Sequence, residues 1–164
     1  SLLEELDVEV ERAARSLNTL SGFLTGPDEL EQLQSTHGPE ASRRVFAELG
    51  RYFLRGLRKY DVCGHYGGSA VFVALPGTDA ERARIVAERF TAVLERLRTN
   101  AGAVSGIVTF SFGVSSLTEG ETRDSWLKRT QTTLDRARQL GGNRIESVDS
   151  LPDPYTVWKA MRSS

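Results

Sequence analysis

The sequence of 164 residues contains a single cysteine, Cys63, so no internal disulfide can form. The cysteine lies in an apolar, strand-like stretch, where a buried and unreactive thiol is expected, and its isolation fits a reducing cytosol. No apolar run approaches the roughly 20 residues that span a bilayer, and the first residues lack the features of a signal peptide. We therefore expect a cytoplasmic chain, or the cytosolic domain of a larger, membrane-anchored protein.

A large charge of one sign is also absent, because 21 basic residues face 22 acidic ones and the formal net charge is −1. This balance argues against a broad electrostatic partner such as duplex DNA or an anionic membrane. Glutamates interrupt the arginines that follow Pro39, so a nucleic-acid-binding stripe is not expected there either. His37 and His65 have no second histidine or cysteine at ligand spacing, and we assign no metal ion to them.

The length and the ordinary apolar fraction fit one globular domain, and the hydrophobic periodicity places its elements. Helices are predicted at residues 2–16 and 28–36, from Pro39 to near Arg58, from an N-cap at Thr78 to 97, and at about 126–137. Strands are predicted at residues 16–24, 60–66, 70–75, 107–114 and 143–148, with a loop at 100–105. The run Thr25-Gly26-Pro27 is expected to end the first strand.

Gly67-Gly68 separates two β-prone runs, which predicts an antiparallel hairpin. A phosphate cradle is the alternative at this glycine pair, but no Lys-Ser/Thr continuation follows it. The alternation of helices and strands predicts an α/β (α+β) fold with one mixed central sheet covered by helices. We assign residues 1–148 to this domain and residues 149–164 to a C-terminal tail. In the tail, Val157, Trp158 and Met161 are expected to form a small docking helix.

Arg58 and Asp61 form an Arg-x-x-Asp motif five residues before the hairpin turn. An arginine fork suits a phosphate or a guanine edge, and a carboxylate accepts hydrogen bonds from guanine N–H groups. The same spacing is also that of an ordinary ion pair at a helix end, which contributes only a few tenths of a kcal/mol. The motif alone does not separate these two interpretations.

Several short motifs occur in a fixed order along the chain. They are Arg58-Lys59-Tyr60-Asp61, His65-Tyr66-Gly67-Gly68, Thr109-Phe110-Ser111-Phe112-Gly113-Val114, Ala137-Arg138, and Gly141-Gly142-Asn143-Arg144. Together with the predicted order of elements they resemble the GGDEF domain, the catalytic module of diguanylate cyclases, which make cyclic di-GMP from two GTP molecules. The resemblance covers about residues 5–148 and implies the nucleotidyl-cyclase-like fold of that family.

The resemblance implies a catalytic site whose chemistry has been lost. Active members hold two Mg²⁺ ions with two acidic residues, and these positions fall at Gly26 and Ala70, which have no carboxylate. Only Asp28 remains of the acidic loop. The other departures, at positions that hold metal, phosphate or guanine in the family, are Pro27, Glu31, Gln34, Arg43, Ser69, Arg138 and Gly142. We therefore expect a degenerate, catalytically inactive domain with no cofactor and no bound Mg²⁺.

The family also has an inhibitory site that binds the product, built from the Arg-x-x-Asp motif and a further arginine. Arg58, Asp61 and Arg89 match these positions, so the resemblance implies a cyclic di-GMP receptor that signals to a protein partner or to an adjacent domain of a larger chain. A homodimer is also compatible with it. The alternative is a structural dimerisation or docking module that binds no nucleotide. An exposed apolar face at Tyr155, Val157 and Trp158 would favour that alternative.

Overall fold

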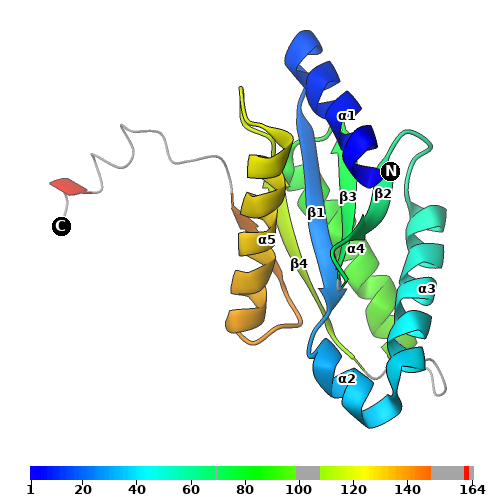
Figure 1. Cartoon of the computed structure of the whole chain (residues 1–164). Coiled ribbons are helices and arrows are strands. Elements are labelled where there is room, and N and C mark those ends of the chain that lie inside the picture. The colour runs from blue at the N-terminus through cyan, green and yellow to red at the C-terminus, as the bar shows by residue number, and fades with distance from the viewer. Residues whose placement is uncertain (69, 99–107, 149–160, 163–164) are drawn as a thin grey trace.

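The computed structural model describes residues 1–68, 70–98, 108–148 and 161–162 (Figure 1). In this part of the chain helices and strands alternate as the sequence predicts. In chain order the elements are α1 (Leu2–Ser16), β1 (Leu20–Pro27), α2 (Leu30–His37), α3 (Pro39–Gly56), β2 (Val62–Tyr66), β3 (Ala70–Pro76), α4 (Ala80–Arg98), β4 (Phe110–Ser116), α5 (Arg123–Gln139) and β5 (Ile145–Val148).

The strands form one sheet in the order β2-β3-β1-β4-β5. The pairs β2–β3, β3–β1 and β1–β4 are antiparallel, and β4–β5 is parallel. Helices α1 and α5 lie in front of the sheet in Figure 1, and α4 lies behind it. The mixed sheet covered by helices and the β2–β3 hairpin are therefore confirmed.

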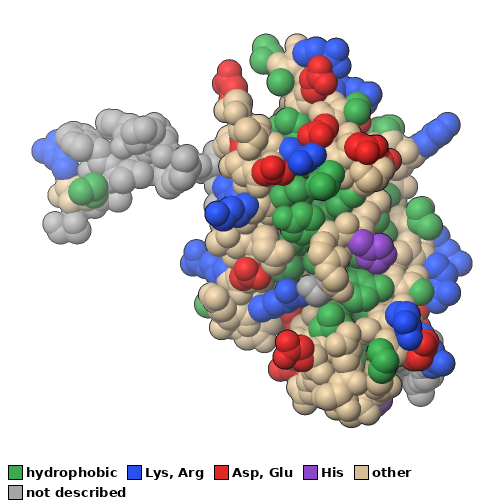
Figure 2. Space-filling view, in the orientation of Figure 1, with side chains coloured by type: hydrophobic (Ala, Val, Ile, Leu, Met, Phe, Trp, Pro, Cys, Tyr) green, Lys and Arg blue, Asp and Glu red, His purple; other side chains and the backbone are tan. Residues whose placement is uncertain are grey.

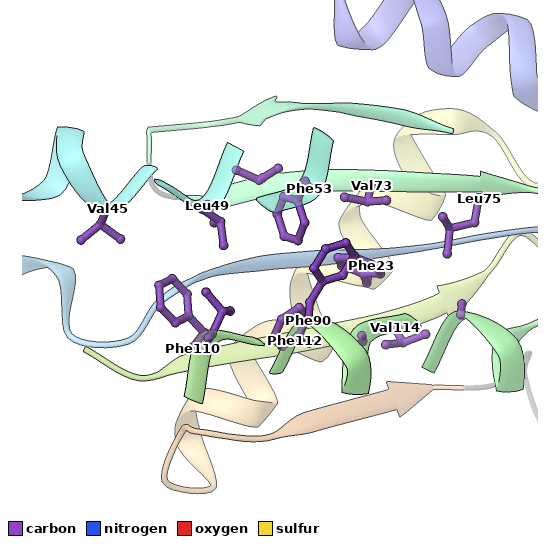
Figure 3. Packing of buried hydrophobic residues seen from close by; sticks show 14 of the residues in the cluster. Phe23, Val45, Leu49, Phe53, Val73, Leu75, Phe90, Phe110, Phe112 and Val114 are labelled. Carbon is purple, nitrogen blue, oxygen red and sulfur yellow. The ribbon is translucent and has the colours of Figure 1, made fainter. Parts of the chain in front are cut away.

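Successive strand residues point to opposite sides of the sheet. Apolar strand residues occur at both sets of positions, so each face of the sheet carries a hydrophobic core. Phe23 of β1 lies at the centre of one core, with its ring centroid 5.5 to 6.2 Å from those of Phe53, Phe90 and Phe112 (Figure 3). The neighbouring residue Leu24 belongs to the second core, which α1 and α5 cover. Burial on both faces fixes the register of the strands, since a shift of one residue would exchange the two sets.

The first strand lies later in the sequence than predicted. Helix α1 continues to Ser16, Leu17 adopts a left-handed conformation with φ 55°, and β1 begins at Leu20. The run Thr25-Gly26-Pro27 does not end the strand, because it pairs with Phe112, Ser111 and Phe110 of β4. Cross-strand pairing and burial therefore override the local preference of glycine and proline for turns.

Two other predicted boundaries change for side-chain reasons. Asp79, not Thr78, caps α4, because its carboxylate accepts a hydrogen bond from the backbone N–H of Arg82 at 2.8 Å. Thr78 is buried and accepts a hydrogen bond from a distant arginine instead. Strand β2 begins at Val62 rather than at residue 60, because Asp61 takes part in a turn.

Some predictions fall outside the described residues. These are the glycine-turn position Ser69, the loop at 100–105, the start of the fourth strand at 107, and the docking residues Val157 and Trp158 of the tail. Met161, which is described, lies in a helical segment and is exposed. No helix in the described part of the chain is long and apolar enough to cross a membrane.

Surface charge is mixed on the side of the molecule that carries α1. Figure 2 shows acidic and basic side chains interspersed around a strip of hydrophobic side chains on this side. This distribution agrees with the near-zero net charge of the chain. Cys63 is a free, partly buried thiol, and burial raises its pKa to about 11, as expected for an unreactive cysteine.

Candidate functional site

Arg58 and Asp61 are held by the turn that follows α3, at the upper right of Figure 1. Helix α3 ends at Gly56, and the backbone N–H of Asp61 donates a hydrogen bond to the carbonyl of Arg58 at 3.0 Å. In return, Oδ2 of Asp61 accepts a hydrogen bond from the backbone N–H of Arg58 at 2.7 Å. The aspartate therefore closes the turn locally, as aspartates commonly do.

The guanidinium of Arg58 joins this turn to the connection between β3 and α4. Its Nε and Nη2 donate to the two carboxylate oxygens of Asp61 at 3.4 and 3.1 Å. Nη2 also lies 3.1 Å from the carbonyl oxygen of Pro76 and 2.9 Å from Oγ1 of Thr78. The hydrogen bond with Asp61 is the main reason why the pKa of Arg58 is raised above its ordinary value.

Arg89 reaches the same region from α4. It is exposed, and its Nη2 donates to the carbonyl of Gly56 at 2.9 Å. Gly56 is the last residue of α3, where backbone carbonyls lack a partner within the helix. A cation at this position also interacts favourably with the negative end of the helix dipole.

A pocket of about 310 Å³ brings the three residues of the sequence prediction together. Its lining comprises Gly56, Leu57, Arg58, Asp61, Leu75, Gly77, Thr78, Arg82, Val86 and Arg89. Arg82 was not among the predicted site residues. Its spacing from Arg89 could have identified it, because seven residues are close to two turns of an α-helix and place both side chains on one face. Three guanidiniums and one carboxylate leave two positive charges uncompensated in this lining.

Asp61 has a different setting from the one the sequence suggests. Its side chain is only 2% exposed, whereas that of Arg58 is 47% exposed. The two carboxylate oxygens already accept hydrogen bonds from Arg58, so the aspartate orients the arginine. Nη1 of Arg58 donates to no acceptor among the described residues, which leaves its two N–H groups available to a ligand.

A second set of predicted positions lies at the opposite end of β3. Thr25 pairs with Val71 in the antiparallel register, which places Gly26 and Ala70 next to each other where β1 and β3 approach α2. Both positions are buried. Neither offers a side-chain oxygen, whereas Mg²⁺ is bound in proteins chiefly through carboxylates. No cluster of three His, Cys, Asp or Glu side chains suited to a metal ion occurs in the described part of the chain.

The carboxylate of this region, Asp28, has protein partners of its own. Its Oδ2 accepts hydrogen bonds from Oγ1 of Thr109 at 2.7 Å and from the backbone N–H of Asn143 at 2.9 Å. Its Oδ1 lies 3.6 Å from Nε of Arg138. A Cβ atom at Gly142 would come within 2.8 Å of Oδ2 of Asp28, so the glycine is needed for this close approach.

The positions expected to read guanine are likewise engaged within the protein. The side-chain amide of Gln34 donates to Oγ of Ser42 at 3.2 Å, and Arg43 forms an ion pair with Glu40 on the same helix. Internal contacts therefore hold side chains at this end of the sheet. It offers no free carboxylate at either predicted metal position.

Comparison with known proteins agrees with this fold. Residues 1–144 match the family model described as diguanylate cyclase, GGDEF domain. Diguanylate cyclase DgcP of Pseudomonas aeruginosa is 25% identical over 146 residues, which are 89% of this chain but 22% of DgcP. The chain thus spans about a fifth of that relative.

Two solved structures extend the comparison. Diguanylate cyclase SiaD of Pseudomonas aeruginosa, in complex with its activator SiaC, is 32% identical with a TM-score of 0.81, over 90% of this chain and 56% of that one. The GGDEF domain of DgcB from Caulobacter crescentus, in complex with c-di-GMP, is 20% identical with a TM-score of 0.79, over 88% of this chain and 86% of that one. The second likeness concerns the fold alone. The chain belongs to the GGDEF domain family of diguanylate cyclases.

Proposed function

We propose that this chain is a catalytically inactive GGDEF domain that binds cyclic di-GMP in the arginine pocket and signals to a protein partner or to an adjacent domain. The observation that carries the proposal is the pocket itself, where Arg58 and Asp61 of the turn after α3 meet Arg89 of α4. We place this activity in the cytosol, where a lone thiol stays reduced.

The charge of the pocket suits such a ligand. Cyclic di-GMP carries two phosphodiester groups, and the lining has two positive charges in excess. Guanidinium forks bind phosphate oxygens and the acceptor edge of guanine through paired hydrogen bonds. Arg58 is held in position by Asp61 and retains the N–H groups of Nη1, so part of the binding geometry is present before the ligand arrives.

Loss of catalysis is supported by the chemistry at the other end of β3. Gly26 and Ala70 give no carboxylate, Oδ2 of Asp28 accepts hydrogen bonds from Thr109 and Asn143, and its Oδ1 lies 3.6 Å from Nε of Arg138. This donor set does not fit the pair of divalent cations that the family's reaction needs. We therefore propose that this domain holds no Mg²⁺ and catalyses no phosphoryl transfer.

A docking module that binds no nucleotide is the second candidate. A groove of about 660 Å³ between the end of α1 and the loop before α5 favours it, because apolar side chains form part of its lining and one of them, Leu17, is 85% exposed. Tyr155, Val157 and Trp158 of the tail, which were expected to take part in docking, lie outside the described residues. Ligand binding separates the two candidates.

Calorimetric titration with cyclic di-GMP tests the proposal. We expect micromolar or tighter affinity for the wild type, with two nucleotides bound per site at saturation. Arg89→Ala should weaken binding about ten- to a hundredfold, because a charge-assisted hydrogen bond contributes roughly 1.5 to 3 kcal/mol. Arg89 is the best probe, since its guanidinium has one hydrogen bond to the described protein residues, the one to Gly56.

Arg136→Ala is the matched control, because it removes the same charge from an exposed position on α5, across the sheet from α4. It should bind cyclic di-GMP like the wild type, and both variants should keep the wild-type melting temperature. Absence of binding by the wild type at high micromolar ligand would refute the receptor and leave the docking module as the better account.

A further inference from the structure

Arg82 differs from the other two arginines of the pocket in having no acceptor in the described part of the chain. Arg58 donates to Asp61, Pro76 and Thr78, and Arg89 donates to Gly56. The backbone N–H of Arg82 is capped by Asp79, but its guanidinium forms no hydrogen bond or ion pair with a described residue. It is exposed and lines the pocket.

The position of Arg82 complements that of Arg89. The two residues are seven apart on α4, which corresponds to about 10 Å along the helix axis and nearly the same face. They therefore present two separate cationic forks on one side of the pocket. Arg58 and its partner Asp61 line the same pocket from the turn after α3.

We infer that Arg82 is a fourth ligand-binding residue of this pocket and that it contacts the second phosphodiester of a cyclic dinucleotide. This inference rests on the proposed function and adds the residue that sets selectivity for ligands with two phosphodiesters. Arg58 and Asp61 neutralise each other in part, so Arg89 alone leaves one clear positive charge for one phosphate. Arg82 supplies the second charge, and no hydrogen bond or ion pair of its guanidinium with a described residue has to be broken to use it.

Two probes test this assignment: cyclic di-GMP, and linear guanylyl-guanosine, which has two guanines but only one phosphodiester. Their dissociation constants are measured at one fixed ionic strength for the wild type, Arg82→Ala, Arg82→Lys and Arg84→Ala. Arg84 is the matched control because it lies on the same helix and carries the same charge, but its side chain contacts Glu88 and Ser147 and is not part of the pocket lining.

We expect Arg82→Ala to weaken cyclic di-GMP about tenfold, to change the affinity for the linear probe less than twofold, and so to lose most of the selectivity. Arg82→Lys keeps the charge without the fork and should lose about threefold. Arg84→Ala should bind both probes like the wild type. Unchanged melting temperatures would show that the fold is intact.

The dissociation constants distinguish a failure of this inference from a failure of the proposed function. If Arg89→Ala weakens binding but Arg82→Ala matches Arg84→Ala, the receptor stands and the role of Arg82 is refuted. Equal weakening of both probes by Arg82→Ala would also refute it, because the residue would then act as a general cation. If the wild type binds neither probe, both proposals fall.

Discussion

Asp61 contributes to the arginine pocket mainly by holding Arg58 in place. Its carboxylate is almost fully buried and accepts hydrogen bonds from the backbone and the side chain of the same arginine. An exposed ion pair of this spacing would contribute little, but a buried acceptor that fixes a turn is costly to remove. The two interpretations of the Arg-x-x-Asp motif are therefore compatible, since the ion pair that shapes the turn also holds the arginine in the pocket lining.

The family resemblance predicted Arg58, Asp61 and Arg89 as one group, and the pocket lining includes all three. The burial of the Asp61 side chain could not be predicted in the same way, because it depends on how distant segments pack around the turn. Arg82 was missed for a related reason. Its side of α4 becomes part of a pocket only when the turn after α3 lies against it.

Glu121, in the loop before α5, gives a prediction on pH. Burial acts to raise the pKa of this carboxyl, but hydrogen bonds from Arg129, Thr118 and Ser125 outweigh it and lower the pKa to about 2. An ordinary glutamate titrates near 4.3, so the unfolded state binds the proton first as pH falls. The ionised form should therefore contribute about 2–3 kcal/mol above pH 5, lost as pH falls from about 5 to 2.

Urea unfolding of the wild type and of Glu121→Gln at several pH values measures this contribution. The wild type should be the more stable protein at pH 7, and the difference between the two should shrink toward zero near pH 2. A difference that stays constant from pH 7 to pH 2 would show that the charge of Glu121 does not carry the effect.

At the scale of elements, the packing of α5 on β4 depends on Gly113. A Cβ atom there would lie 2.5 Å from the backbone nitrogen of Leu134 and 2.8 Å from the carbonyl oxygen of Thr130. Backbone atoms cannot move aside as a flexible side chain can. We expect Gly113→Ala to lower the free energy of unfolding by about 1–3 kcal/mol, since the helix must shift away from the sheet.

Gly50 provides the control for this substitution. It lies within α3, and a Cβ atom there would meet nothing within 4 Å. Gly50→Ala should therefore raise the free energy of unfolding by about 0.4–1 kcal/mol, because alanine favours the helix. Chemical denaturation measures both variants, and equal effects of the two would contradict the close approach inferred at Gly113.

The kind and order of the elements could be predicted because the hydrophobic pattern repeats with the period of each element. Their boundaries were less predictable where distant partners decide them. Gly26 and Pro27 are turn formers by local preference, yet β4 pairs with both and extends β1 to Pro27. Asp79 and Thr78 are both acceptable caps by type, and the choice follows from the hydrogen bond between Thr78 and Arg58.

At the scale of the whole molecule, β3 connects the two regions that the sequence singles out. It begins at Ala70, one of the two positions that the family resemblance assigns to metal ligands, and ends at Pro76, whose carbonyl accepts a hydrogen bond from Arg58. Seven strand residues separate the two regions by about 20 Å. Residues at one end of the strand therefore do not contact the arginine pocket at the other end.

This separation leads to the last prediction, that the domain makes no cyclic di-GMP from GTP and Mg²⁺ even where the arginine pocket binds the dinucleotide. Ser69→Asp combined with Ala70→Glu should not restore activity, because Gly26 still gives no second metal ligand and Gln34 and Arg43 remain engaged with Ser42 and Glu40. Product is measured by chromatography after incubation with GTP. Formation above a blank that disappears on mutation of Asp28 would overturn the inactive assignment. Activity gained by the double variant alone would instead show that the metal positions had been assigned to the wrong residues.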